Sequence, residues 1–264
     1  MAMRFHFGSG NVGWHWNELG RRNPLGAVLA PAGEQSPARA LEEFFATGRA
    51  DVARLIARLT HVAPGLRRRS ALDFGCGVGR SSRALADHFE TVMGIDVAPS
   101  MIAHARALNR EYPRCHFRVN RSVRLRGQPS GNFDLVYSRL VLQHIPPRRV
   151  RRYIPELVRV LAPGGVLVFQ LPAEVAVDPR EEYCEAPVAD TLVKRHLPRF
   201  LVTLYRRLKY QFVVPDAVPR MEMFGMPRAA VIALLQSAGA TVVDVHPDDS
   251  HGTDASGFEY WVTK

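Results

Sequence analysis

Three glycines at alternate positions follow an acidic residue in the stretch LDFGCGVGRSS, which begins at Leu72. Gly75, Gly77 and Gly79 have no Cβ atom, so the chain can turn sharply there and bring its main-chain N–H groups against a ligand. Asp73 lies two residues ahead of this turn, where its carboxylate would repel a pyrophosphate and attract a cationic group. The spacing therefore indicates a binding site for a ligand with a positive charge.

A second acidic residue extends this pattern, because Asp96 ends the apolar stretch TVMGID. A carboxylate about 20 residues after such a turn accepts hydrogen bonds from both hydroxyls of a ribose. A dinucleotide fingerprint, GxGxxG/A, would require Gly or Ala at position 80 when it is counted from Gly75, and position 80 is Arg. An ammonium group near Asp73, a ribose on Asp96 and no phosphate requirement together describe S-adenosylmethionine as the cofactor.

These residues need strands and helices to position them. The hydrophobic pattern predicts strands over residues 71–74, 91–96, 115–119, 133–138 and 166–171, with helices over 81–88, 99–109 and 147–161 between them. Two further helices are expected over 38–47 and 51–61, after an irregular arm that ends near residue 37. Because strands alternate with helices, we expect a doubly wound α/β sheet that binds its ligand beyond the carboxyl ends of the strands.

Four segments, in family order, resemble the motifs of the class I S-adenosylmethionine-dependent methyltransferases, and more closely their bacterial small-molecule group. They are LDFGCGVGR, GIDVAPSM, FDLVYSRLVLQHIPP and LVRVLAPGGVLVFQLP, within residues 71–172. A helix expected over 227–239 precedes TVVDVHPD and GFEYWVTK, which resemble the antiparallel hairpin at the end of the methyltransferase sheet. The resemblance implies a Rossmann-like methyltransferase sheet, mostly parallel with a C-terminal antiparallel hairpin, and S-adenosylmethionine as methyl donor.

The resemblance also implies a set of cofactor-binding residues at the strand ends. This set is Asp73, Gly75, Cys76, Gly77, Gly79, Asp96, Val97, Met101, Asn120, Arg121, Ser138 and Arg139. Val97 and Met101 would pack near the adenine, and the main-chain carbonyls of Ser138 and Arg139 would meet the methionine ammonium. The linker after Asn120, NRSVRLRGQPSGNFD, departs from the acidic, apolar linker that is common in the family.

Methyl transfer from a sulfonium depends chiefly on positioning and desolvation, so a general base is optional. His144, in LQHIPP after the fourth strand, is the candidate catalytic residue, because histidine can take a proton from a hydroxyl. A purely structural role in this loop is the alternative.

The acceptor is inferred by elimination. Methylation of nucleic-acid amino groups typically goes with an Asn/Asp-Pro-Pro-aromatic run after the fourth strand, and this chain has YSRLVLQH there. We therefore expect a small-molecule acceptor, with O-methylation of a natural-product or lipid-like compound. An RNA methyltransferase and a non-catalytic nucleoside- or partner-binding protein of the same fold are the alternatives.

The length of 264 residues, of which 47% are hydrophobic, suits a single methyltransferase domain with a full core. Within it we expect an N-terminal arm or lid over 1–50 with Trp14, His15 and Trp16, a cofactor-binding core over 51–172 and 225–264, and a cap over 173–224. A cap helix is expected around 198–212, with an apolar side and a basic side. Ordinary packing, a gate over an apolar acceptor, and contact with a membrane surface or acidic partner are its three interpretations.

The net charge of +10 comes chiefly from arginines spread along the chain, so it does not favour a nucleic-acid partner. No apolar run reaches the roughly 20 residues that cross a bilayer, and we expect a cytoplasmic protein. The three cysteines offer neither a CxxC pair nor a zinc pattern, so no metal is expected. The sequence does not indicate an oligomeric state.

Overall fold

The computed structural model of the chain describes residues 12–28, 37–175, 223–248, 250 and 255–264. Its strands are β1 (Ser70–Phe74), β2 (Thr91–Asp96), β3 (Cys115–Val119), β4 (Phe133–Ser138), β5 (Leu161–Val175), β6 (Thr241–Asp248) and β7 (Ala255–Thr263). Its helices are α1 (Val12–Arg22), α2 (Pro37–Val62), α3 (Arg80–Leu85), α4 (Pro99–Leu108), the 3₁₀ turn η2 (Leu142–His144), α5 (Pro147–Val160) and α8 (Arg228–Ser237).

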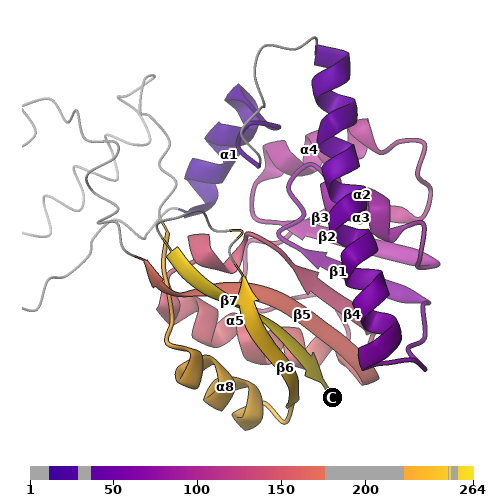
Figure 1. Cartoon of the computed structure of the whole chain (residues 1–264). Coiled ribbons are helices and arrows are strands. Elements are labelled where there is room, and N and C mark those ends of the chain that lie inside the picture. The colour runs from indigo at the N-terminus through magenta and orange to yellow at the C-terminus, as the bar shows by residue number, and fades with distance from the viewer. Residues whose placement is uncertain (1–11, 29–36, 176–222, 249, 251–254) are drawn as a thin grey trace, which may run out of the picture.

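All these strands belong to one sheet, in the order β3-β2-β1-β4-β5-β7-β6 (Figure 1). Strands β1 to β5 pair in parallel, and β7 pairs antiparallel with both β5 and β6. The strand order reverses between β1 and β4, and at such a point the loops beyond the strand ends diverge and leave room for a ligand. The architecture confirms the expected mostly parallel sheet with a C-terminal antiparallel hairpin.

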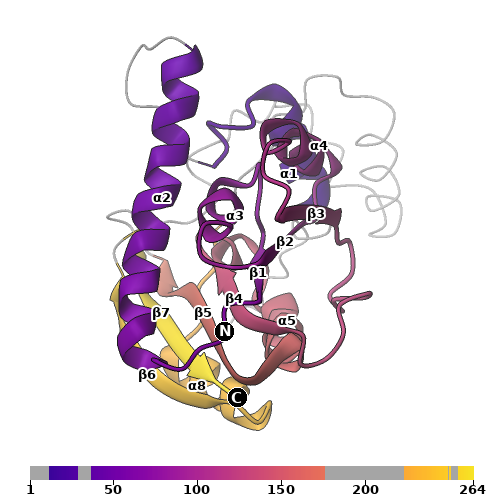
Figure 2. The same cartoon turned by 90° about the vertical axis from the view of Figure 1, so that its right-hand side faces the viewer.

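Helices cover both faces of the sheet (Figure 2). Side chains alternate between the faces because the strand repeat is two residues. On β4, for example, Leu135 and Tyr137 belong to the core under α2 and α3, whereas Val136 belongs to the core under α5 and α8. Both cores are made almost wholly of aliphatic and aromatic side chains, as a sheet covered on two faces requires. These cores fix the strand ends that hold the candidate site.

The structure corrects two sequence-based expectations in the N-terminal part. The helices expected over 38–47 and 51–61 are a single helix, α2, of 26 residues. A glycine within a helix costs only about 1 kcal/mol, and at Gly48 it also allows close packing, because a Cβ there would lie 2.6 Å from the Arg80 carbonyl oxygen. The expected boundary between residues 50 and 51 falls inside this helix. The prediction of two helices is therefore wrong.

The arm before residue 37 was expected to be irregular, but it contains the helix α1. This helix packs on α4, where Ser100 donates a main-chain hydrogen bond of 3.0 Å to Asn17 Oδ1 and a side-chain hydrogen bond of 2.7 Å to the Asn17 carbonyl. Tertiary contacts of this kind leave no periodic pattern in a short glycine-rich segment, so the sequence does not reveal the helix.

Most of the expected cap, including the helix around 198–212, lies outside the described residues. Within the part of the chain that the structure describes, no helix has the length and apolar character needed to cross a membrane. The cytoplasmic location, the domain division and contact of the cap helix with a membrane surface stay predictions.

Candidate cofactor-binding and active site

A cavity of about 360 Å³ lies at the carboxyl edge of the sheet, beyond β1, β2 and β4. This volume is within the range of small-molecule sites. Most of the site residues expected from the sequence line it, namely Asp73, Gly75, Cys76, Gly77, Asp96, Val97, Met101, Asn120, Arg139 and His144. Gly79, Arg121 and Ser138 are not among the lining residues: Gly79 precedes α3, Arg121 is exposed, and Ser138 is buried at the end of β4.

The glycine turn forms one wall of the cavity. Its first amide donates a hydrogen bond of 2.8 Å from Gly75 to the Ile95 carbonyl, which ties the turn to the end of β2. Gly75 and Gly77 have φ angles of +78° and +52°, in the left-handed region that favours glycine. At Gly75 a side chain would also meet Val141 of the loop after β4. Glycine is therefore required at Gly75 both by conformation and by space.

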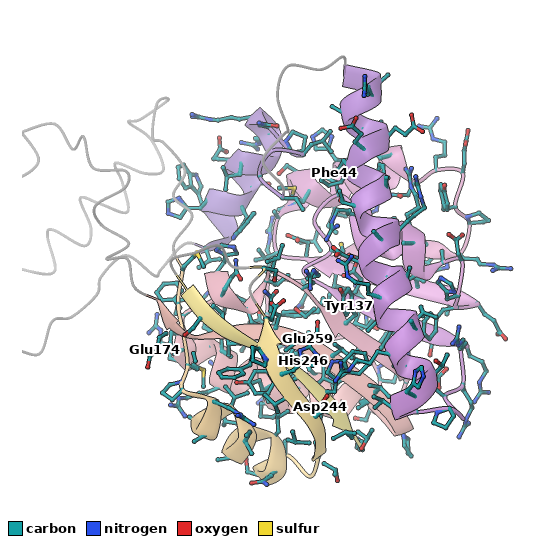
Figure 3. The ribbon with its side chains drawn as sticks, viewed as in Figure 1. Phe44, Tyr137, Glu174, Asp244, His246 and Glu259 are labelled. Carbon is teal, nitrogen blue, oxygen red and sulfur yellow. The ribbon has the colours of Figure 1, made fainter. Side chains whose placement is uncertain are left out.

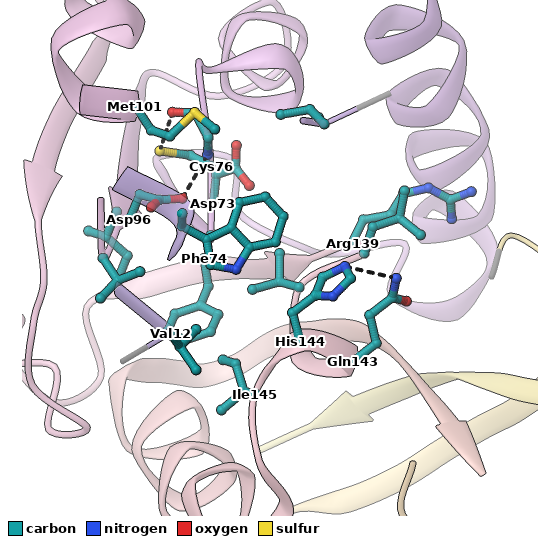
Figure 4. Close-up of a pocket in the computed structure, with 18 of the residues that line it drawn as sticks. Val12, Asp73, Phe74, Cys76, Asp96, Met101, Arg139, Gln143, His144 and Ile145 are labelled. Carbon is teal, nitrogen blue, oxygen red and sulfur yellow. Dashed lines mark hydrogen bonds between the residues drawn. The ribbon is translucent and has the colours of Figure 1, made fainter. Parts of the chain in front are cut away.

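Asp96 is half-buried at the end of β2 and points into the cavity (Figure 4). Its Oδ2 accepts a hydrogen bond of 3.0 Å from the Gly77 amide, and its Oδ1 accepts one of 2.8 Å from the Ala98 amide. Burial raises the pKa of this carboxyl, and these amides partly oppose the shift. Each carboxylate oxygen has a second lone pair, so Asp96 can accept two further hydrogen bonds from a ligand.

Asp73 is 4% exposed and lies at the end of β1 beside the glycine turn. Burial raises its pKa from the ordinary 3.8 to about 6, although Ser82 Oγ donates a hydrogen bond of 2.6 Å to its Oδ2 and Arg80 also favours the charged form. The nearby Asp96 carboxylate raises the pKa further. At neutral pH Asp73 is mostly ionised, and a buried carboxylate of this kind attracts a cationic group.

His144 and Gln143 lie across the cavity from Asp96 (Figure 4). The two Nε2 atoms are 3.1 Å apart. Because an amide nitrogen can only donate, this contact is a hydrogen bond when His144 Nε2 is the acceptor. The indole of Trp16 packs edge-on against the His144 ring, with centroids 5.1 Å apart. His144 is therefore a buried imidazole whose Nε2 faces the amide nitrogen of Gln143.

The loop between β4 and η2 is held in an uncommon conformation. Leu140 has a φ of +59°, the only positive value for a non-glycine residue among the described parts of the chain. Its amide donates a hydrogen bond of 2.9 Å to Oε1 of Gln170, a buried residue of β5. Strained backbone of this kind persists where surrounding contacts determine it, and it is common at functional sites.

Several residues of the cavity wall were missed by sequence reasoning. Arg80 stood out only as the residue that breaks a dinucleotide fingerprint, yet it lines the cavity and forms an ion pair with Asp51 of α2. Tyr153 and Arg149 reach the cavity from the first turns of α5, where no pattern in the sequence indicates chemistry. Of the aromatic cluster in the arm, Trp16 lines the cavity, whereas Trp14 and His15 do not.

Comparison with known proteins finds similarity to methyltransferases in the central part of the chain. Residues 72–169 match a family model described as a methyltransferase domain, and this range contains Asp73, Asp96 and His144. A trans-aconitate 2-methyltransferase of Methylobacterium radiotolerans is 37% identical over 126 residues, which are 47% of this chain and 44% of that protein. A 2-methyl-6-phytyl-1,4-hydroquinone methyltransferase of Synechocystis sp. is 39% identical over 100 residues, which are 38% of this chain and 30% of that protein. The chain matches less than half of the length of either relative.

Solved structures support the same fold. The magnesium protoporphyrin IX methyltransferase of Synechocystis PCC 6803, determined with bound SAH, superimposes with a TM-score of 0.60 at 17% identity and covers 96% of this chain and 97% of its own. A SAM-dependent methyltransferase of Leishmania major also has a TM-score of 0.60, at 15% identity, and covers 97% of this chain and 82% of its own. At such low identities the likeness shows the fold alone.

Proposed function

We propose that the chain transfers a methyl group from S-adenosylmethionine to a hydroxyl of a small natural-product or lipid-like molecule. The match of residues 72–169 to a methyltransferase domain supports this proposal. The observation on which this proposal rests most is the pairing of the Gly77 amide with Asp96 at the edge of a 360 Å³ cavity. A carboxylate and a side-chain-free turn on the same wall of the cavity support binding of a ribose next to the methionine part of the cofactor.

The residues present fit S-adenosylmethionine. The free lone pairs of Asp96 match two adjacent ribose hydroxyls, and the buried Asp73 carboxylate matches an ammonium group. At Gly75 and Gly77 the main chain borders the cavity with no side chain in between, which leaves room for the methionine part. When bound, the cofactor supplies a methyl group on a sulfonium, which is activated for in-line displacement without further help.

The residues of the chain would then position the acceptor, exclude water from it and remove its hydroxyl proton. Trp16, Val28 and Val141 give the cavity an apolar wall that excludes water, and exclusion of water strengthens the electrostatic interactions within a site. His144 Nε2 is the atom that would take the proton of the acceptor hydroxyl, once the acceptor replaces the amide of Gln143 as its partner. Met223 and Ser250 border the cavity from the C-terminal part of the chain, where the acceptor would enter.

A small-molecule acceptor is supported by the relatives. Their names refer to trans-aconitate and to a phytylated hydroquinone, both small organic molecules. Since these relatives are enzymes, they favour a catalyst over the non-catalytic alternative.

The proposal is tested by calorimetric titration of S-adenosylmethionine into the wild type and into Asp96→Ala. Loss of a carboxylate that accepts two ligand hydrogen bonds should weaken affinity at least tenfold, by on the order of 2–4 kcal/mol. Asp87→Ala, which removes an exposed carboxylate just after α3, is the control and should bind like the wild type. Unchanged affinity in Asp96→Ala, or preferential binding of NAD by the wild type, would contradict the proposal.

The acceptor class is tested separately by transfer of a labelled methyl group from S-adenosylmethionine. Small hydroxylated compounds, carboxylic acids and total RNA are offered as acceptors in parallel. Label should appear in an alkali-stable ether of a hydroxylated compound. Label that is released by mild alkali would indicate a methyl ester, and label in RNA would favour the RNA alternative.

A further inference from the structure

Asp51 of α2 forms ion pairs with arginines from two different cofactor-site loops. Its Oδ2 lies 2.7 Å from a terminal nitrogen of Arg80 and 3.3 Å from Nε of Arg139. Arg80 directly follows the glycine turn, and Arg139 directly follows β4. The three side chains are 12%, 6% and 17% exposed in the order Asp51, Arg80 and Arg139. One largely buried carboxylate therefore connects both loops.

The packing of α2 on α3 explains how Asp51 reaches this position. At Gly48 the helix backbone comes so close to Arg80 that a Cβ atom would lie 2.6 Å from the Arg80 carbonyl oxygen. Thr47 Oγ1 accepts a hydrogen bond of 3.1 Å from the Arg80 guanidinium. Asp51 follows Gly48 by about one helical turn, so its side chain is on the same side of α2.

The loop after β4, which contains Arg139, also contacts the hairpin of β6 and β7. Glu259 of β7 lies 3.8 Å from Arg139 through its Oε2. Its Oε1 accepts a hydrogen bond of 2.8 Å from Trp261 Nε1 and lies 3.2 Å from His246 Nε2 (Figure 3). These contacts fix Glu259 beside Arg139. Arg139 therefore has carboxylates around it from α2, β6 and β7, namely Asp51, Asp248 and Glu259. Arg80 has only Asp51 as its ion-pair partner among the described residues.

The charges matter because both arginines line the cavity. S-adenosylmethionine has a net positive charge from its sulfonium, whereas the product S-adenosylhomocysteine is a neutral thioether with the same remaining groups. Interactions between charges are strong in a buried site, where screening by water is weak. Glu259 offsets part of the charge of Arg139, and Asp73 part of the charge of Arg80. Without Asp51 the remaining positive charge would weaken binding of the sulfonium more than binding of the neutral thioether.

From this arrangement we infer that Asp51 is a positioning residue for the cofactor, which holds the glycine turn and the β4 loop together and neutralises their arginines so that the site accepts a sulfonium. The inference rests on the proposed function, because it concerns the same ligand. Asp51 contacts the arginines and not the cavity itself. Its effect on the cofactor is therefore indirect.

The test is to measure binding of S-adenosylmethionine and S-adenosylhomocysteine separately by calorimetry in Asp51→Asn, which keeps the size of the side chain and removes its charge. We expect the dissociation constant for S-adenosylmethionine to rise about tenfold or more, and that for S-adenosylhomocysteine to rise less than about threefold. Glu42→Gln, an exposed carboxylate-to-amide change on the same helix, is the matched control and should change neither constant.

A second variant separates the effect of charge from a general loss of structure. Asp51→Asn combined with Arg139→Gln removes one charge of each sign, so the net charge near the cavity equals that of the wild type. The double variant should regain most of the wild-type preference between the two ligands. Equal weakening of both ligands in Asp51→Asn, or a double variant with the same ratio of affinities as the single one, would overturn the inference. If the wild type binds neither ligand, the proposed function fails, and the inference with it.

Discussion

A Cβ atom on Gly75 would lie 2.4 Å from both methyl carbons of Val141. The two residues belong to different loops, the turn after β1 and the loop after β4, which meet where the strand order reverses. Their contact leaves no space for a side chain, and it sets the separation of the two loops that border the cavity. The geometry of the site is therefore sensitive to the size of these two side chains.

Gly75→Ala should disrupt the protein more than the same change at a glycine of similar conformation elsewhere. The backbone strain of the left-handed region and the overlap with Val141 together should lower the free energy of unfolding by about 2–5 kcal/mol. Gly164 isolates the strain, because its φ is +74° and a Cβ added there would meet no atom within 4 Å. Gly164→Ala should lower stability by only about 1–2 kcal/mol and leave cofactor affinity unchanged.

The contribution of Val141 can be separated by adding Val141→Ala to Gly75→Ala. Removal of the two methyl groups relieves the closest contacts, although the Val141 Cβ would stay 2.9 Å from the new side chain. The double variant should therefore regain part of the lost stability, measured by denaturant unfolding, and part of the affinity for S-adenosylmethionine. No restoration in the double variant would mean that the two loops do not meet as described.

The raised pKa of Asp73 predicts a pH dependence of stability. A carboxyl whose pKa is about 6 in the folded state and 3.8 when unfolded binds protons more readily in the folded state. The free energy of unfolding of the ligand-free protein should therefore fall as pH rises from about 4 to about 6, by about 3 kcal/mol for this group. In Asp73→Asn this contribution should be absent, so the curves of wild type and variant converge at low pH.

The same group should affect cofactor binding in the opposite direction. Protonated Asp73 cannot attract an ammonium group, so affinity for S-adenosylmethionine should decrease as pH falls below about 6. Asp96 also has a raised pKa and adds to this decrease. Calorimetry at pH 5 and pH 7.5 should therefore show a smaller pH effect in Asp73→Asn than in the wild type, and an equal effect would exclude Asp73 from ligand binding.

Trp16→Ala should separate an active-site role of α1 from a packing role. Trp16 is half-buried, so its removal should cost about 1–2 kcal/mol of stability, less than loss of a fully buried tryptophan. Because it lines the cavity beside His144, the acceptor KM should rise about tenfold. Trp14→Ala, two residues away and outside the cavity wall, is the control. Equal acceptor KM values in the two variants would contradict a role for Trp16 at the site.

The sequence allowed prediction of the sheet because its strands are short apolar runs bounded by glycine, proline and polar residues. The strand from Cys115 and the strand from Phe133 have the predicted bounds. Asp96 and Gly75 could be placed at the ligand edge because their spacing follows from the first two strand ends of such a sheet. Local pattern was sufficient for these features.

Asp51 and Gln170 could not be found in this way. Each acts on a loop far away in the sequence, Asp51 on Arg80 and Arg139, and Gln170 on Leu140. A lone aspartate on an amphipathic helix is ordinarily a solvated surface residue, so its type and position indicate nothing special. Such side chains acquire their role only from the tertiary arrangement, which the pattern of a single chain does not specify.

His144 is the residue whose role in methyl transfer most needs a direct measurement. If its Nε2 takes the proton from the acceptor, His144→Ala should lower kcat by about 100-fold or more, within the range for loss of a general base. Affinity for S-adenosylmethionine should stay within about twofold, because His144 lies across the cavity from Asp96 (Figure 4).

The matched control for that variant is His61→Ala, which removes an exposed imidazole at the end of α2 and should leave kcat unchanged. Gln143→Leu gives a second comparison, because it removes the donor to Nε2 but keeps the imidazole. A base released from this donor should remain active, so Gln143→Leu should keep most of the turnover that His144→Ala loses. Near-normal turnover in His144→Ala would instead assign His144 to the structure of the loop before α5.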